Sequence, residues 1–264
     1  MYTRLPRLLL VTIFVCSMIL FGARANAQVL PAEDHVGELG LMFFKPSPEL
    51  TLSTDATASA LGTVDFVQEF NIEDKTFPEF RAAIGRNHKF RVSHVKFSYE
   101  ESATINRTFV FQGRTFIVGA PASADIDWDL WTLGYEWDFV RRERGFFGVI
   151  ADLKYNKIEA SVESTALSSP AATDTKAPVP TIGVIGRGYI APMVAITGEF
   201  TGLKVSSGDF DVKFTDFDIS GIVSFGRFVG AQIGYRSVIA DYVVDEDTGV
   251  LKMKGPYFGG VLRF

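Results

Sequence analysis

Apolar and polar residues alternate in several segments of this chain, and this pattern restricts its fold more than any other feature. The clearest segments are 131–139, 194–200, 229–236 and 258–264. One set of alternate residues is mostly large and apolar, whereas the other set is mostly polar, charged or small. Because successive side chains of a β-strand point to opposite faces of a sheet, the pattern predicts an all-β protein whose strands each have one apolar face.

The apolar faces could point into a dry core, as in a soluble sandwich or a lipocalin-like barrel, or out to lipid, as in a transmembrane barrel. The polar faces hold few solubilising lysines or glutamates and many of the 24 glycines, as a crowded interior requires. The apolar faces carry aromatic residues that could form an interfacial girdle, namely Trp131, Tyr135, Trp137 and Tyr235. Both features favour a single antiparallel up-and-down transmembrane β-barrel.

The N-terminus has the pattern of an export signal. Arg4 and Arg7 precede an uncharged apolar run over 8–21, and 25–27 offers a small-x-small cleavage site. The run is shorter than the ~20 residues of a spanning helix. We therefore expect a signal peptide over 1–27 and a mature domain over 28–264, with an uncleaved anchor as the alternative. The mature domain would lack cysteine, because Cys16 is the one cysteine of the chain.

Turn signals divide the mature chain into ten expected strands. They lie at 36–44, 78–86, 89–99, 125–141, 145–160, 180–190, 193–205, 210–225, 228–243 and 250–264. Short connections fall at one end and long ones at the other, as in outer-membrane barrels with short periplasmic turns. Reassigning one hairpin would give eight or twelve strands. Within the long connections we expect extra hairpin structure over 64–72 and 107–118, and a mobile loop over 161–179.

Charged residues of both signs fall on the faces expected to line the lumen. They are Glu136, Asp138, Asp152, Lys154, Arg187, Glu199, Asp216, Asp218, Arg236 and Arg263. Burial of an unpaired charge is costly, so these side chains should pair across strands. A barrel of about eight strands is just filled by its side chains and ten strands add little room. The prediction is a lumen largely filled by ion pairs, with a small pore at most.

The C-terminus resembles the recognition signal of the outer-membrane barrel assembly machinery. The matching residues are Gly259, Leu262 and Phe264, and Tyr257 fills the first, polar position loosely. The last strand has an unpaired edge until the barrel closes, so it can be bound by strand addition.

With this signal in place, the chain resembles the small monomeric outer-membrane barrels of the OmpA-membrane-domain and opacity-porin-like group. The segments that carry the resemblance are 62–66 leading into 77–80, and 255–257. The resemblance implies a Gram-negative outer-membrane location and a monomer, and it implies fold more strongly than activity.

Candidates for chemistry are sparse. Ser93, His94 and Ser98 suggest a base and a nucleophile, but His94 is expected low on an early strand, and a girdle or lumen histidine is the favoured interpretation. Asp125, Asp127 and Asp129 could hold Ca²⁺ at a rim, although a solvated acidic loop base is favoured. We expect no metal and no cofactor.

The favoured function is therefore a non-enzymatic outer-membrane barrel, either structural or a narrow conduit for small solutes or ions. Alternatives are a lipid-modifying or proteolytic barrel enzyme, and a surface-recognition or adhesion barrel that acts through its long loops. The expected partners are outer-membrane lipids and, during biogenesis, the assembly machinery. The formal net charge of −5 and the lack of a basic run argue against nucleic acid.

Overall fold

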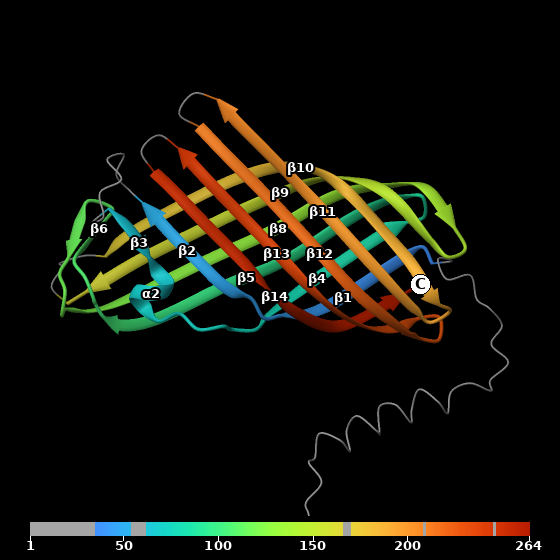
Figure 1. The fold of residues 1–264 in the computed structure, drawn as a ribbon, viewed down its shortest axis with the longest axis horizontal. Coiled ribbons are helices and arrows are strands. Elements are labelled where there is room, and N and C mark those ends of the chain that lie inside the picture. Colours follow the sequence, from blue (N-terminus) through green and yellow to red (C-terminus); the bar gives the residue numbers. More distant parts are fainter. Residues whose placement is uncertain (1–34, 54–61, 166–169, 208–209, 245–246) are drawn as a thin grey trace, which may run out of the picture. The chain divides into compact units, whose positions relative to one another are not determined.

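Ten long strands form an antiparallel sheet that closes on itself (Figure 1). The structure is a computed structural model that describes residues 35–53, 62–165, 170–207, 210–244 and 247–264. The closed order is β1-β4-β5-β8-β9-β10-β11-β12-β13-β14, with β14 paired to β1. The strands are β1 (Gly37–Phe44), β4 (Phe77–Gly85), β5 (His88–Thr104), β8 (Pro121–Arg142), β9 (Gly145–Ser164), β10 (Ala171–Ala191), β11 (Val194–Ser207), β12 (Phe210–Phe225), β13 (Val229–Val244) and β14 (Asp247–Arg263).

These strands match the ten expected ones in order, so the predicted fold class is confirmed. Several strands are longer than the alternation indicated: β5 continues to Thr104 and β8 begins at Pro121. The expected mobile loop over 161–179 is wrong in extent, because residues 161–162 of β9 pair with residues 171–172 of β10. The prediction failed because composition alone cannot distinguish a loop rich in Ala, Ser and Thr from a paired strand of the same composition. Residues 166–169 lie outside the described part of the chain.

Smaller elements occupy two of the long connections. Between β1 and β4 lie β2 (Ser47–Ser53), which pairs with β14, β3 (Thr63–Asp65), which pairs with β2, and the helix α2 (Phe66–Phe70). The expected hairpin over 64–72 is therefore wrong, since most of this segment is helix. The expected hairpin over 107–118 is confirmed as β6 (Phe109–Phe111) and β7 (Arg114–Phe116).

The barrel has two chemically different halves. We call the half that contains β2, β3, α2, β6 and β7 the loop half, and the half that contains the short turns and the C-terminal Phe264 the turn half (Figure 1). The short turns join β4 to β5, β8 to β9, β10 to β11, and β12 to β13.

Strand β8 shows how the two halves differ. Its outward residues are apolar and exposed in the turn half, with Trp131 44% and Leu133 58% exposed. Its outward residues in the loop half are polar, ending at Asp129. The inward residues change in the opposite sense, from buried Glu136 in the turn half to buried Trp128 in the loop half. The apolar face of the strand therefore changes sides between residues 129 and 131.

Neighbouring strands change sides at the same level. On β9 the last outward apolar residue is Tyr155 and the next outward residue is Lys157, while the inward face changes from Asn156 to Ile158. Because the change is shared by paired strands, the outward apolar residues of the turn half form a continuous belt, which we call the apolar band. Such a belt is the lipid-facing surface expected of a transmembrane barrel.

The loop half has an apolar core instead of a charged lumen. Its inward strand residues meet the side chains of β2, β3, α2 and the β6–β7 hairpin in one cluster of buried residues. Aromatic contacts tie the parts together: Phe66 meets Phe111 edge to face at 5.4 Å, and Phe97 meets Phe77 at 5.3 Å. The expectation that ion pairs fill the lumen is thus wrong for this half, where water outside the wall favours apolar side chains inside.

Helix α2 lies in the loop half, where it contacts β2, β3, β5 and β8. Asp65 caps the helix by accepting hydrogen bonds from the backbone N–H groups of Val67 and Gln68 at 3.1 and 3.2 Å. Asn71 ends it in the left-handed conformation with φ 52°. Arg107, just before β6, donates to the carboxylate of Glu69 and to the carbonyl oxygen of Thr63, which joins the hairpin segment to this helix.

No helix in the described ranges has the length and apolar character to span a bilayer. The expected signal peptide, 1–27, lies outside the described residues and stays a prediction.

The change of sides predicts where a charge is tolerated. Leu133→Arg, in the apolar band, should lower the free energy of unfolding in lipid vesicles by about 2–4 kcal/mol. Ser123→Arg, on the outward face of the same strand in the loop half, should change it by less than about 0.5 kcal/mol. Urea titration of both variants measures this difference, and equal costs would contradict the proposed band.

Candidate functional site

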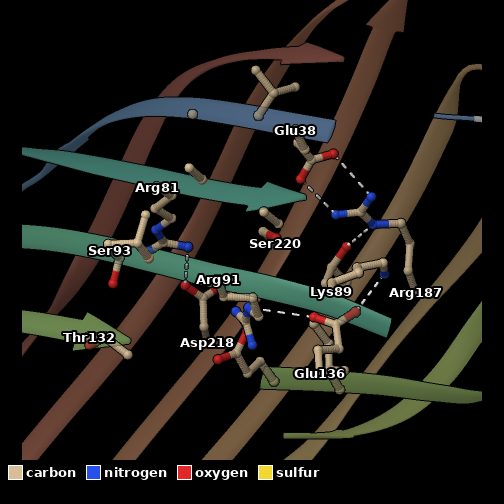
Figure 2. A pocket seen from close by; sticks show the side chains of 18 of the residues that line it. Glu38, Arg81, Lys89, Arg91, Ser93, Thr132, Glu136, Arg187, Asp218 and Ser220 are labelled. Carbon is tan, nitrogen blue, oxygen red and sulfur yellow. Dashed lines mark hydrogen bonds and ion pairs between the residues drawn. The ribbon is translucent and has the colours of Figure 1, made fainter. Parts of the chain in front are cut away.

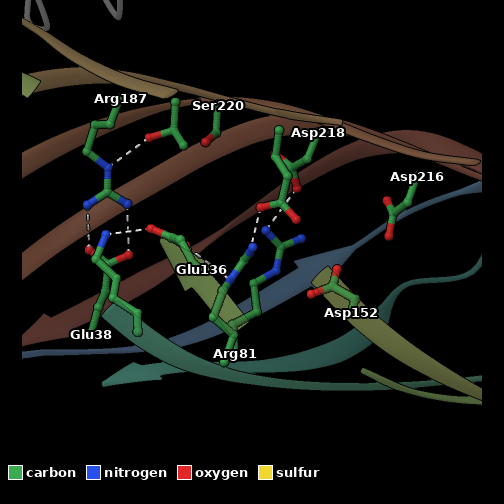
Figure 3. A network of polar contacts seen from close by, with 12 residues as sticks. Glu38, Arg81, Glu136, Asp152, Arg187, Asp216, Asp218 and Ser220 are labelled. Atoms are coloured by element: carbon green, nitrogen blue, oxygen red, sulfur yellow. Dashed lines mark hydrogen bonds and ion pairs between the residues drawn. The ribbon is translucent and has the colours of Figure 1, made fainter. Parts of the chain in front are cut away.

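The inward face of the turn half is a cluster of charged side chains, which we call the charged lumen (Figure 3). Eight carboxylates and seven cations make it up, and each takes part in an ion pair: Glu38, Glu79, Glu136, Asp138, Asp152, Glu199, Asp216, Asp218, Arg81, Lys89, Arg91, Lys154, Arg187, Arg236 and Arg263. Almost equal numbers of opposite charges make burial of the whole set possible.

Arg236 is at the centre of the most deeply buried group. Its Nε and Nη2 donate to the two oxygens of Asp216 at 3.0 and 2.8 Å, and its Nη1 contacts Glu79. Lys154 reaches the same Asp216 carboxylate at 2.7 Å. These four side chains come from β13, β12, β4 and β9, and each is less than 10% exposed. The bidentate geometry on Asp216 is the strong form of a guanidinium–carboxylate pair.

A second group connects β4, β12 and β14. Arg81 donates to Asp218 at 2.8 Å (Figure 2), and its guanidinium lies 4.7 Å from the centre of the Tyr257 ring. The Tyr257 hydroxyl donates to Asp218 at 2.7 Å, and Gln232 donates to that hydroxyl at 3.0 Å. Tyr257 was predicted as part of the assembly signal. In the folded barrel its side chain is buried in the lumen.

The remaining cations lie nearer the short turns. Arg91 donates to Glu199 at 2.6 Å. Lys89 contacts Glu136 (Figure 2), and its Nζ lies 2.7 Å from the carboxylate of Asp138.

Closest to the turn end, Arg187 contacts both oxygens of Glu38 at 3.0 and 3.1 Å, and Arg263 donates to Glu38 at 2.7 Å. The ring of Phe146 lies under Lys89 at 3.8 Å and near Arg187 at 5.5 Å. Phe146 also packs with Ile150 and Ile185, which gives this end of the lumen a small apolar patch.

The structure places all ten sequence-predicted lumen residues on the inward face. Sequence reasoning missed Glu38, Glu79, Arg81, Lys89 and Arg91, which lie on β1, β4 and β5. The signal was present, since Glu79 and Arg81 flank the outward Phe80, and Lys89 and Arg91 flank the outward Phe90. Lys89 follows the short turn between β4 and β5, yet its side chain points into the lumen, where it pairs with Glu136 and Asp138.

A cavity of about 120 Å³ lies within the charged lumen. Thr132 Oγ1, Asp152 Oδ1 and Arg91 Nη1 have no hydrogen-bond partner among the described residues, and all three side chains line this cavity. A cavity of this size with polar walls has room for several water molecules that would satisfy these atoms. Gly134 allows the arrangement, because a Cβ at that position would collide with the Asp152 carboxylate.

The candidate catalytic and metal residues, apart from Ser93, lie on the outward face instead. His94 is at the loop-half edge of the apolar band, not low on its strand as expected. Its ring stacks on Trp131 with 4.2 Å between ring centres, and its Nε2 lies 2.9 Å from Asp129. Ser93 points to the lumen, on the other face of the wall. His94 thus lies on the outward face beside Trp131, which agrees with a girdle histidine and not with a lumen histidine, the two interpretations left open by the sequence.

Asp125, Asp127 and Asp129 share the outward face of β8 in the loop half, above the apolar band. Partial burial and the charge of Asp127 raise the pKa of Asp125. Burial also opposes ionisation of Asp127, but hydrogen bonds from Lys96 and Ser98 outweigh it and hold the pKa of Asp127 below its usual value. Among the described residues, no group of three or more His, Cys, Asp or Glu side chains is placed to hold a metal ion.

Comparison with known proteins supplies the class of this fold. No protein-family model and no curated protein matches the sequence. The solved structure of the outer membrane protease OmpT from Escherichia coli matches with a TM-score of 0.57 and 7% identity, covering 88% of this chain and 97% of that chain. The chain has the fold of the outer-membrane β-barrels. Identity this low indicates shared architecture and carries no residue role.

Two further solved structures match less closely. The translocator domain of the autotransporter NalP from Neisseria meningitidis has a TM-score of 0.43 at 9% identity, covering 94% of this chain and 93% of that chain. The Pseudomonas putida toluene transporter TodX has a TM-score of 0.35 at 7% identity, covering 88% and 90%.

The four predicted girdle residues Trp131, Tyr135, Trp137 and Tyr235 all point outward from the barrel and are between 40% and 46% exposed. Of the predicted assembly signal, Leu262 and Phe264 point outward, and Gly259 is on the inward face beside Met42.

Breaking the central ion pairs should lower the free energy of unfolding much more than breaking an exposed pair. Arg236→Met should lower the free energy of unfolding by about 3–5 kcal/mol, because Asp216 and Glu79 lose a buried partner. Lys157→Met, which breaks an exposed pair with Glu159, should leave the urea midpoint of unfolding close to that of the wild type. Urea titration in detergent micelles measures both.

Adding Asp216→Asn to Arg236→Met should recover part of the loss, because it removes the uncompensated carboxylate. A double variant as unstable as the sum of the single variants would contradict the proposed pairing.

Proposed function

We propose that this protein resides in the bacterial outer membrane as a closed, non-enzymatic barrel with a structural role. The single observation that carries the proposal is that both halves of the lumen are filled, one by an apolar core and the other by paired charges. A protein that transports through its lumen needs a continuous polar path. Side chains interrupt such a path here.

The apolar core is the stronger barrier of the two. A charged lumen can hold water and small ions in the 120 Å³ cavity, but an ion that moved on would have to enter the cluster around Trp128, Phe97 and Phe111, each fully buried. Moving an unpaired charge into such surroundings costs many kcal/mol. This supports a structural barrel over the alternative of a narrow ion conduit.

An enzymatic role has less support. His94 and Asp129 form a pair of the kind that orients a general base, yet in the described ranges no serine, threonine or cysteine donates a hydrogen bond to His94. Ser98, the nearest outward serine on the same strand, bonds Asp127 instead. Expression of the protein should therefore leave the mass of lipid A unchanged. Expression of the His94→Ala variant should give the same lipid A mass as the wild type.

The partners proposed from the sequence fit this role. The apolar band would contact outer-membrane lipids, and the C-terminal residues Leu262 and Phe264, which point outward, are open to recognition by the barrel assembly machinery. A monomer and a relationship to the OmpA-membrane-domain and opacity-porin-like group remain parts of the proposal.

Planar-bilayer recording tests closure. The refolded mature protein should give no steady open level under conditions where a general porin conducts. Removal of residues 107–118, which takes out β6 and β7 but no wall strand, should produce intermittent openings because the core is hollowed. The matched control, Ile117→Ser with Val118→Ser, changes two exposed residues of the same segment and should stay silent. Stable conductance of the wild type would overturn the structural role.

Location is tested by fractionation combined with gel migration. The protein should sediment with outer membranes, and unheated samples should migrate differently from boiled ones, since a closed barrel resists SDS until heated. Recovery in the soluble periplasmic fraction as a compact protein would contradict the proposal at the level of its class.

A further inference from the structure

Asp152 differs from the other carboxylates of the charged lumen in lacking a close cationic partner (Figure 3). Each of the other seven has an arginine or lysine nitrogen within 2.8 Å. The ammonium of Lys154 lies 3.7 Å from Asp152 Oδ2 but 2.7 Å from Asp216. The Asp152 side chain is only 2% exposed. A buried carboxylate without a matching charge is costly, so Asp152 needs a further positive group.

Two threonine hydroxyls near this carboxylate also lack a partner. Asp152 Oδ1 has no hydrogen-bond partner among the described residues, and it lies over Gly134, where a Cβ would collide with it. Thr132 Oγ1 is unpartnered as well, and its side chain lines the same cavity as Asp152. Thr181 is directly opposite Asp152 in the ladder of β9 and β10, and its Oγ1 is a further unpartnered atom. Both threonines are buried. Three adjacent strands thus each contribute a buried oxygen atom without a partner.

The nearby cations are committed to other carboxylates. Arg91 donates to Glu199 at 2.6 Å, and its Nη1 is not bonded to Asp152 Oδ1, since both atoms lack a hydrogen-bond partner. His35 lines the cavity and lies 3.8 Å from Glu38, so a proton on its ring would add charge there and not at Asp152. With eight carboxylates and seven lysine or arginine side chains in the charged lumen, one negative charge stays uncompensated.

The donor set indicates which cation suits this place. Carboxylate and hydroxyl oxygens are ligands of hard metal cations. A calcium ion takes about six to eight oxygen ligands, usually from several carboxylates, whereas Asp152 is the one carboxylate here without a close partner. Lys154 would also repel a divalent ion more than a monovalent one. The cavity of about 120 Å³ has room for a small ion and for water molecules that complete its coordination. A single monovalent ion matches both the ligands and the missing charge.

We propose that the charged lumen binds one monovalent alkali cation, such as Na⁺, at Asp152 Oδ1, with the hydroxyl oxygens of Thr132 and Thr181 and cavity water as further ligands. The ion enters from the turn end, because His35 and Glu38 line the same cavity. An ion that binds only the closed barrel stabilises it by mass action. The inference goes beyond the proposed function, since it requires the folded turn half but neither an outer-membrane location nor a structural role.

Urea titration of the refolded mature protein in uncharged micelles tests the proposal, with sodium chloride replaced by choline chloride at constant ionic strength. The urea midpoint of the wild type should rise with the sodium concentration. Asp152→Asn keeps the shape of the side chain but removes its charge, so the midpoint should no longer respond to sodium. Glu159→Gln removes an outward carboxylate from the same strand and should respond as the wild type does. Gly134→Ala keeps the Asp152 charge but displaces Oδ1, and it should weaken the response.

Equilibrium dialysis against radioactive sodium measures binding directly. The wild type should retain one sodium ion per barrel. Loss of an outer-shell group typically weakens metal binding about 10–100-fold, so Asp152→Asn, which removes a ligand, should weaken it by at least about tenfold.

Equal midpoints of the wild type in the two salts, or a sodium response that Asp152→Asn retains, would overturn the inference. Heat-dependent gel migration of the same samples separates this failure from failure of the proposed function. A folded, heat-modifiable barrel without a sodium response refutes the cation site alone. A wild type that conducts steadily in planar bilayers but shows the sodium response of Asp152 refutes the structural role and supports the site.

Discussion

Pairing of β1 with β14 is the constraint on which the rest of the structure depends. A sheet in hydrocarbon must satisfy every backbone N–H and C=O group within itself, and closure leaves no free edge. Once ten strands are closed, every strand has one face toward the outside of the barrel and one toward a narrow interior. The charged side chains of the turn half are then shielded from bulk water. They can be stabilised only by one another and by water in the small cavity. Closure therefore makes pairing of charges such as Arg236 and Asp216 obligatory.

The strands are longer than the apolar band, and this length explains the two kinds of interior. Where lipid surrounds the wall, outward Leu133 is apolar and inward Glu136 is charged. Where water surrounds it, outward Asp129 is polar and inward Trp128 is apolar. The same backbone thus follows the rule of a membrane barrel at one end and of a soluble protein at the other. The inserted β2, β3, α2, β6 and β7 complete the soluble-like core, because their apolar side chains join the buried cluster of the wall.

Alternation was sufficient to predict the barrel class, the ten strands and the inward position of residues such as Asp152 and Lys154, because period two assigns faces without knowledge of contacts. It could not predict the exchange of faces, since both Trp128 and Trp131 are large and aromatic and the sequence alone does not say which solvent surrounds each. It also missed α2, where five residues capped by Asp65 are too few to show helical periodicity. The partners of Arg81 and Glu38 come from strands distant in sequence, so their pairing depended on the closed topology.

The charged lumen also restricts how the strands can pair. A shift of β12 by one residue against β13 would turn Asp216 and Asp218 to the lipid side and bring Phe217 and Ile219 into the lumen. Exposure of the Asp216 and Asp218 carboxylates to lipid would oppose that shift, and so would the loss of the partner of Arg236. An apolar interior in the turn half would lack this discrimination, because apolar side chains are tolerated on both faces of a wall in lipid. The ion pairs can therefore specify the strand register even if they add little net stability. They raise the free energy of the wrong registers, while the core of the loop half stabilises the right one.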